Sequence, residues 1–85
     1  MKEERIGIIS HYYDRIGVAA VVLEGELAVG DTIHIKGHTT DFTQKIESIQ
    51  IEHEQIERAK KGDNIGIKVK EHTRNRDIVY KVFEE

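Results

Sequence analysis

The sequence predicts an all-β fold, a small closed barrel of about six antiparallel strands. Apolar residues recur with a period of two along most of the chain, which is typical of strands. Proline is absent, so the turns depend on Gly, Asp and Asn. The chain has 85 residues, enough for one core, and closure of the sheet would hide strand edges that otherwise promote aggregation. We therefore expect residues 1–85 to form a single domain.

Four stretches show the strand pattern most clearly. Residues 18–23 read V-A-A-V-V-L and are apolar on both faces, as in a strand that is covered on both sides. In residues 33–36 two isoleucines alternate with a histidine and a lysine, and residues 65–70 alternate apolar side chains with Gly and Lys. Residues 77–83 can place apolar side chains on either face.

The phase of the pattern slips near residue 47. Ile46 has an even residue number, whereas Ile49 and Ile51 have odd ones. One continuous strand would therefore place Ile46 on the opposite face of the sheet from Ile49 and Ile51. A β-bulge near Glu47 and Ser48 would restore the phase, and two separate short strands are the alternative. The segment that follows, residues 53–61, is expected to form a turn or a short helical piece that ends at a glycine.

Part of the sequence occurs twice. Residues 30–36 and 62–68 both read G-D-x-I-x-I-K. The glycine can take a positive φ at a turn, and the aspartate can accept hydrogen bonds from nearby backbone amides. Two similar corners that lead into similar strands explain the repeat. The predicted turn residues are Gly25, Gly30, Asp31, Gly62 and Asp63.

The charges are divided along the chain. The net charge of −3 argues against a globally basic nucleic-acid binder. Glutamates at 47, 52, 54 and 57 have no Lys or Arg between them, whereas residues 68–81 are mainly basic. Two solvated strand faces would explain this division, and so would one basic surface for an anionic partner.

Several classes of protein do not fit the composition. Cysteine is absent, which removes disulfides, thiolate chemistry and zinc–sulfur sites. No apolar run approaches the roughly 20 residues of a membrane span. The chain begins with M-K-E-E-R, and no apolar core of a signal peptide follows. A cytoplasmic location without a membrane partner is therefore expected.

Three motifs occur in a characteristic order: G-x-L-x-V-G-D-x-I-x-I-x-G at residues 25–37, S-I-Q at 48–50 and G-D-N-I-G-I at 62–67. In these motifs the chain resembles the second domain of the translational GTPases, the barrel domain of elongation factor Tu and related initiation and elongation factors. The likeness extends from about residue 16 to residue 82. It implies a six-stranded barrel with Greek-key-like connections.

The resemblance implies little chemistry. The phosphate-binding motif G-x-x-x-x-G-K-[ST] does not occur, so GTP hydrolysis is not implied. In elongation factor Tu this barrel helps to hold the aminoacyl end of tRNA, and Asn64 matches a family position that lines that pocket. The alternative role for Asn64 is that of a turn residue that bonds its own backbone.

No catalytic or metal site is expected. Residues 53–57 approach the zinc-protease motif H-E-x-x-H but have a glutamate in place of the second histidine. His34 and His38 would lie on a strand and the turn after it, and Glu24 and Glu26 would flank a turn in solvent. We therefore expect a protein that is not an enzyme and needs no cofactor.

Aromatic residues beside cations are the best binding candidates, because they can stack on bases and contact phosphate. The alternative is that one tyrosine closes the barrel end and the other covers the hairpin. The candidate RNA-binding residues are Tyr12, Tyr13, Arg15, Asn64, Lys68, Lys70, Arg74 and Arg76, beside His11.

Two functions follow. The first is a translation-factor-like binding module that contacts RNA or a ribonucleoprotein such as the ribosome. The alternative is a docking or assembly module for a larger enzyme or GTPase, with the acidic stretch 47–57 as the docking surface.

Overall fold

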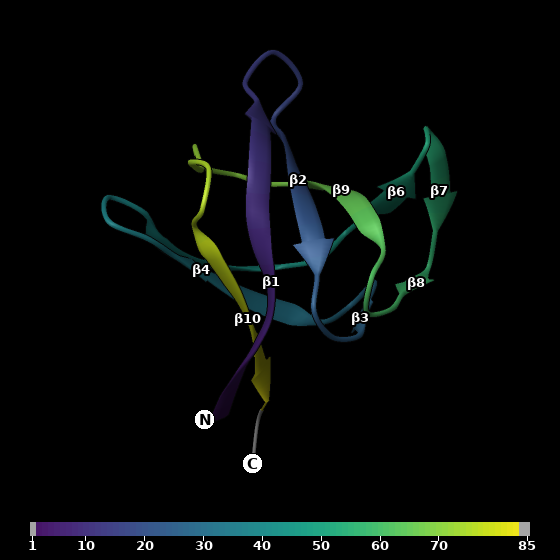
Figure 1. Ribbon diagram of the computed structural model, residues 1–85, viewed down its shortest axis with the longest axis horizontal. Helices are drawn as coiled ribbons and strands as arrows, with labels where there is room; N and C mark the ends of the chain where they lie inside the picture. The colour runs from purple at the N-terminus through teal and green to yellow at the C-terminus, as the bar shows by residue number, and fades with distance from the viewer. Residues whose placement is uncertain (1, 84–85) are drawn as a thin grey trace.

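The computed structural model describes residues 2–83, which form ten β-strands and no helix (Figure 1). All the pairings between these strands are antiparallel. The all-β antiparallel class is therefore confirmed. The strands are β1 (Lys2–Tyr13), β2 (Val18–Leu23), β3 (Leu27–Ala28), β4 (Thr32–Lys36), β5 (Asp41–Lys45), β6 (Ile49–Ile51), β7 (Glu54–Ile56), β8 (Arg58–Ala59), β9 (Asn64–Lys68) and β10 (Ile78–Phe83).

Eight strands form one sheet in the order β5-β4-β10-β1-β2-β9-β6-β7, and β3 and β8 form a separate two-stranded sheet. β10 lies between β4 and β1, and β9 lies between β2 and β6, so hairpins alternate with long connections. Within residues 2–83 the edge strands β5 and β7 do not pair with each other. The closed six-stranded barrel is thus not confirmed: the large sheet curves around the core without closing, and the strands are shorter and more numerous (Figure 1).

β1 can follow this curve because it contains two irregularities. One register shift, between Arg5 and Gly7, interrupts its pairing with β10, and another, between Ile9 and His11, interrupts its pairing with β2. Gly7 suits the first of them, since a Cβ there would lie 2.7 Å from Cγ1 of Val21. Bulges of this kind bend a strand and increase its twist.

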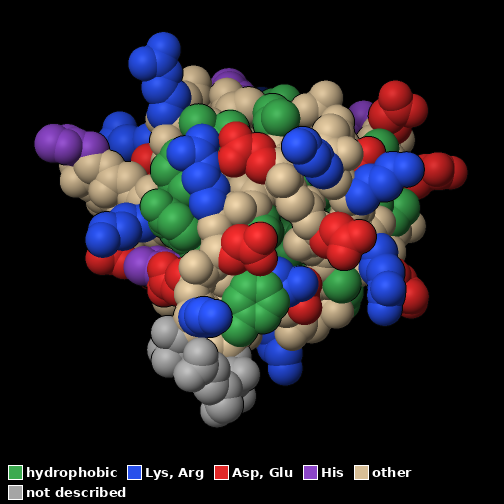
Figure 2. All heavy atoms as spheres, turned by 60° about the horizontal axis from the view of Figure 1, so that its bottom comes forward, with side chains coloured by type: hydrophobic (Ala, Val, Ile, Leu, Met, Phe, Trp, Pro, Cys, Tyr) green, Lys and Arg blue, Asp and Glu red, His purple; other side chains and the backbone are tan. Residues whose placement is uncertain are grey.

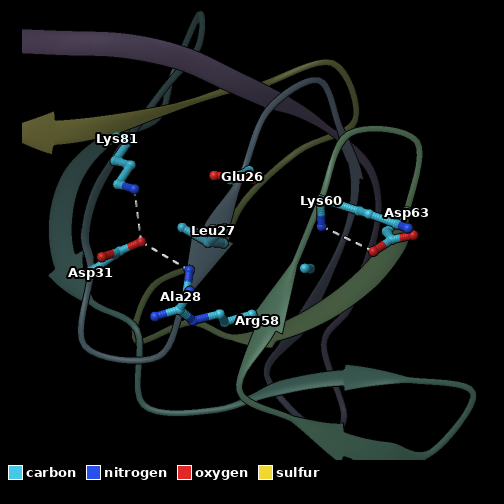
Figure 3. A pocket seen from close by; sticks show the side chains of 9 residues that line it. Glu26, Leu27, Ala28, Asp31, Arg58, Lys60, Asp63 and Lys81 are labelled. Carbon is cyan, nitrogen blue, oxygen red and sulfur yellow. Dashed lines mark hydrogen bonds and ion pairs between the residues drawn. The ribbon is translucent and has the colours of Figure 1, made fainter.

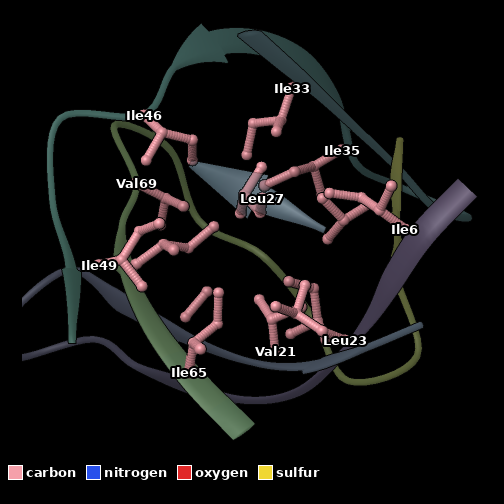
Figure 4. Close-up of a cluster of buried hydrophobic side chains, with 14 of the residues drawn as sticks. Ile6, Val21, Leu23, Leu27, Ile33, Ile35, Ile46, Ile49, Ile65 and Val69 are labelled. Carbon is pink, nitrogen blue, oxygen red and sulfur yellow. The ribbon is translucent and has the colours of Figure 1, made fainter. Parts of the chain in front are cut away.

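The core is one cluster of buried apolar side chains (Figure 4). Leu27 of the two-stranded sheet lies at the centre of the view and is only 1% exposed, so the small sheet is joined to the large one by packing. Burial of a large aliphatic side chain contributes about 1.5–3 kcal/mol. The largest fully buried apolar side chains are Ile6, Ile9, Leu23, Leu27, Ile33, Ile35, Ile46, Ile49 and Ile67, and the larger Phe42 is buried with 8% of its surface exposed.

The prediction that residues 18–23 are covered on both faces is wrong. Ala19, Val21 and Leu23 are buried, whereas Val22 is 37% exposed. The reason is that β2 belongs to a single sheet around the core, so its outer face meets solvent. Only the inner face of this strand therefore contributes to the core.

Around residue 46 the structure has two separate short strands, which was the alternative to a β-bulge. β5 and β6 are separate strands on either side of Ile46, and no bulge joins them. Ile46 and Ile49 can both be buried because Ile46 lies outside the two strands, so the alternation along a strand does not relate them. Residues 53–61 contain β7 and β8 instead of a helical turn, since β7 pairs with β6 and β8 pairs with β3.

The two copies of the repeat form matching turns at residues 28–31 and 60–63, which we term the twin corners. Their glycines have φ of 98° and 94°, a region that a Cβ would strain. In each corner the aspartate carboxylate accepts a hydrogen bond from the backbone N–H three residues earlier, that of Ala28 (2.9 Å) or Lys60 (3.0 Å). The same local chemistry therefore builds both turns.

The tertiary contacts of the twin corners match as well. Residues 30–31 exchange two backbone hydrogen bonds with Ile46, at 2.9 and 2.8 Å. Residues 62–63 exchange two with Leu23, both at 3.0 Å. The fold therefore contains a local twofold relation between its two halves.

Candidate functional site

A shallow hollow of about 440 Å³ lies between the β1–β2 hairpin and residues 72–75. Tyr12 is half-buried and packs against the core, and its ring lies 4.5 Å from the ring of His72. The rings of His11 and Tyr13 lie edge to face at 4.4 Å. We call this hollow the hairpin basin; its lining residues are His11, Tyr12, Asp14, His72, Thr73, Arg74 and Asn75.

The buried carboxylate of Asp77 holds the second wall of the basin in place. It accepts a hydrogen bond from the backbone N–H of Arg74 at 2.8 Å, which closes the turn at residues 74–77. The backbone of the same turn bonds to Ile9, where the pairing of β1 with β2 shifts register. These contacts place Arg74 beside the aromatic end of β1.

Thr73 lies beneath this wall and is fully buried. Its hydroxyl group finds no hydrogen-bond partner among the residues that the structure describes. Leaving such a group unsatisfied costs about 1–3 kcal/mol. The basin therefore has an unused polar group among its lining residues.

The structure brings together only part of the predicted RNA-binding set. Tyr12 and Arg74 line the hairpin basin. Tyr13 and Arg15 are exposed at the hairpin, and Arg76 is exposed with a φ of 74°. The remaining three lie elsewhere: Lys68 and Lys70 line a different hollow beside Glu47, and Asn64 is exposed at the start of β9.

The acidic stretch folds as the β6–β7 hairpin, which we call the acidic hairpin. Its turn residues Glu52 and His53 both have positive φ, 49° and 69°. β7 is an edge strand of the large sheet. A hollow of about 330 Å³ beside it is lined by Val29, Glu47, Ser48, Ile49, Gln55, Ile56 and Glu57. Val29 is 42% exposed, so this surface combines apolar contact area with carboxylates.

A histidine on the sheet surface is held between two carboxylates. The imidazole of His34 contacts Glu3 through Nδ1 at 2.9 Å and Asp41 through Nε2. The hydrogen bond to Asp41 raises the pKa of His34 above 6.5, burial opposes this, and Glu3 reinforces it. The same hydrogen bond lowers the pKa of Asp41. No pattern in the sequence indicated this cluster, because its members lie on three different strands.

The structure also shows where the other catalytic and metal-binding candidates of the sequence lie. Glu24 accepts hydrogen bonds from Nε and Nη2 of Arg5 at 2.8 and 3.3 Å, which makes it an ion-pair partner. Within residues 2–83 no group of three His, Asp or Glu side chains is arranged to hold a metal ion. Nor does that part of the chain contain a helix long and apolar enough to cross a membrane.

Comparison with known proteins identifies relatives of two kinds. Residues 18–76 match the family described as elongation factor Tu domain 2. An elongation factor 1-alpha of Methanopyrus kandleri is 41% identical over 71 residues, 73% of this chain and 17% of that factor. An uncharacterized protease of Methanocaldococcus jannaschii is 39% identical over 80 residues, 93% of this chain and 20% of the protease. A collagenase of Porphyromonas gingivalis is 46% identical over 72 residues, 82% of the chain and 20% of the collagenase.

A solved structure shows the same fold. The chain is similar to the C-terminal domain of a Geobacillus thermoleovorans protein assigned to the U32 peptidases, with a TM-score of 0.88 and 25% identity over 94% of this chain and 93% of that chain. The chain spans about a fifth of the length of the curated relatives that it matches.

Proposed function

Since the chain belongs to the elongation factor Tu domain 2 family, we propose that it is a non-catalytic docking module for a larger protein of the U32 peptidase type. The observation that carries this proposal is its likeness, over nearly its whole length, to the C-terminal domain of such a protein. The proteases that it matches are about five times longer, so their catalytic residues have room outside the matched segment. The module would be either joined to the larger protein or held by it without a covalent bond.

The acidic hairpin is the proposed docking surface. β7 offers the free edge of a sheet, which can bind an extended segment through backbone hydrogen bonds. Val29 and Ile56 supply apolar contact, and Glu47 and Glu57 lie in the same hollow. A partner surface with Lys or Arg around an apolar side chain would match it, because complementary charge steers association and fixes orientation.

Association with the U32 peptidase-like polypeptide of the same cell tests this function. Analytical ultracentrifugation of the two purified components is expected to show a complex of fixed stoichiometry. Val29→Asp and Glu57→Lys are each expected to weaken it by about tenfold, a change of about 1.4 kcal/mol. Val22→Asp is the matched control, since Val22 is also an exposed valine but lies on β2. Lack of a complex, or equal loss with the control, would contradict the proposal.

The non-catalytic part of the proposal has its own test. The purified chain is expected to leave casein and unfolded collagen uncleaved. Turnover that follows the chain through successive purification steps would contradict this expectation.

A second function is favoured by the hairpin basin. It places Tyr12, the tilted ring of His72 and the side chain of Arg74 in one hollow, a combination that can hold an unpaired base and its phosphate. Fluorescence anisotropy with a labelled structured RNA and with tRNA tests for RNA binding at low and moderate salt. Salt-sensitive binding that Tyr12→Ala and Arg74→Gln weaken is the expected result. No binding at low salt would reject this function.

A further inference from the structure

A cavity of about 410 Å³ lies over the two-stranded sheet formed by β3 and β8, between the twin corners (Figure 3). This end of the molecule carries interspersed acidic and basic side chains with apolar side chains between them (Figure 2). We call the cavity the corner pocket. Its charged lining residues are Glu26, Asp31, Arg58, Lys60, Asp63 and Lys81. Neither the docking surface nor the hairpin basin includes any of them.

The corner pocket lies between the segments that the local twofold relation makes equivalent. Leu27 pairs with Ala59 across the small sheet, and these two residues are separated by the same interval as the two glycines of the repeat. The residue before each of them lines the pocket: Glu26 in one half and Arg58 in the other. Equivalent positions in the two halves therefore carry opposite charges.

One side of the pocket has an excess of positive charge. Nζ of Lys81 lies 3.2 Å from Oδ2 of Asp31, and the same oxygen accepts the backbone N–H of Ala28. The guanidinium of Arg58 lies on the same side (Figure 3). Within residues 2–83 the carboxylate of Asp31 thus pairs with Lys81 alone and already accepts a backbone N–H. Among the residues that the structure describes, no ion pair involves Arg58.

The opposite side has a free carboxylate. Glu26 lies across Leu27 from Arg58 in Figure 3. It takes part in none of the ion pairs formed within residues 2–83. Ala28 and Ala59 contribute apolar wall between the two charged sides. Within the described part of the chain, the cavity therefore offers an unpaired charge of each sign, Arg58 and Glu26, on either side of an apolar middle, and Lys60 and Asp63 line it as well.

We propose that the corner pocket binds a small zwitterion of amino acid or dipeptide size. The carboxylate of the ligand would lie against Arg58 and Lys81, its ammonium group against Glu26, and its apolar part over the alanines. The volume lies within the range of about 300–1,000 Å³ that is common for small-ligand sites. Charge-assisted hydrogen bonds at both ends would select ligands that carry both charges. This inference is independent of the proposed docking function.

The dipeptide Gly-Leu and its two blocked forms test the proposal by NMR titration of the labelled chain. Gly-Leu is expected to shift the amide signals of Ala28, Ala59 and Lys60, with a dissociation constant on the order of 1 mM. N-acetyl-Gly-Leu lacks the cation and Gly-Leu amide lacks the anion. Each is expected to bind about three- to tenfold more weakly, as for the loss of one partly exposed charged contact.

Matched variants locate the site. Arg58→Gln and Glu26→Gln are each expected to weaken Gly-Leu binding by about three- to tenfold. Lys70→Gln and Glu54→Gln remove one charge of each sign outside the pocket, and they are expected to leave the affinity unchanged. The altered residues are exposed, so the variants are expected to fold. An unchanged pattern of amide signals away from the altered residue will show that they do. Lack of saturable shifts at these amides, or blocked dipeptides that bind as tightly as Gly-Leu, would overturn the proposal.

Discussion

The side-chain amide of Gln44, on β5, bonds to the backbone of Lys68, on β9, although β5 and β9 do not pair as strands. Nε2 of Gln44 donates to the carbonyl of Lys68 at 2.9 Å, and Oε1 accepts the N–H of Lys70 at 2.9 Å. β5 is an edge strand, whereas β9 lies five strands further along the sheet order. One side chain thus connects two distant parts of the large sheet and helps to keep it curved around the core.

Gln44→Ala is expected to lower the free energy of unfolding by about 1–2 kcal/mol, because two hydrogen bonds are lost. Urea denaturation measures this change, and hydrogen exchange at the Lys70 amide is expected to become faster. Thr43→Ala, at the exposed position next to it, is the control and is expected to change stability little. A Gln44→Ala variant with an unchanged urea midpoint would show that the two parts of the sheet hold together without this amide.

Gly37→Ala is expected to destabilise the protein by about 1–3 kcal/mol. A Cβ at this position would overlap the buried carboxylate of Asp77, which also accepts the N–H of Arg74. Thermal unfolding measures the loss. In an Asp77→Ala background the added cost of Gly37→Ala is expected to fall, since the overlapping group is gone. Costs that simply add in this double-mutant cycle would place the strain elsewhere.

Asp31→Ala is expected to cost more stability than Asp63→Ala, although the two residues occupy matching turns. Each variant loses a bond to a backbone N–H, a loss of about 1 kcal/mol. Asp31 also pairs with Lys81, and a partly buried pair of this kind adds up to about 1 kcal/mol. Chemical denaturation of both variants at low and high salt measures the difference, which is expected to shrink as salt screens the pair. Equal costs at low salt would mean that the Lys81 pair contributes no stability.

The His34 cluster is expected to make stability depend on pH. Since folding raises the pKa of His34 above 6.5, its stabilising effect is complete below pH 6.5 and is lost as pH rises through the folded value. Folding lowers the pKa of Asp41 from 3.8, so its effect is present above that pH and is lost as pH falls. The contribution is therefore largest between these two values. Lys36 and Tyr80 are the other groups next to this pair.

His34→Gln tests this dependence, because it keeps a polar side chain but does not titrate. The wild-type free energy of unfolding is expected to decline from about pH 6.5 to pH 8, and the decline is expected to flatten in the variant. His38→Gln, on the exposed loop that follows β4, is the control. Equal slopes for the wild type and His34→Gln would contradict the assignment.

Local patterns in the sequence predicted the strands and the family but not the arrangement of the sheet. The alternation in residues 33–36 corresponds to β4, with Ile33 and Ile35 buried, because side-chain direction along a strand is a local property. The apolar run of β2 was misleading, since exposure of Val22 depends on whether a second layer covers the strand. The Gly-Asp pairs of the repeat form turns because φ and the nearest backbone amides are also local.

The candidate sites depended on contacts that no local pattern contains. Tyr12 and Arg74 meet because the turn at Asp77 is bonded back to β1. The corner pocket needs the pairing of Leu27 with Ala59, and the His34 cluster needs three strands side by side.

The sequence alone determined the all-β class, the two Gly-Asp turns and the family, because each depends on residues that are close along the chain. The tertiary structure decided that the large sheet stays open and that the twin corners face a shared pocket. It also decided which charges remain unpaired. The reason is that backbone pairing between distant segments sets which side chains meet, and the cost of closing the loops between them depends on the whole fold.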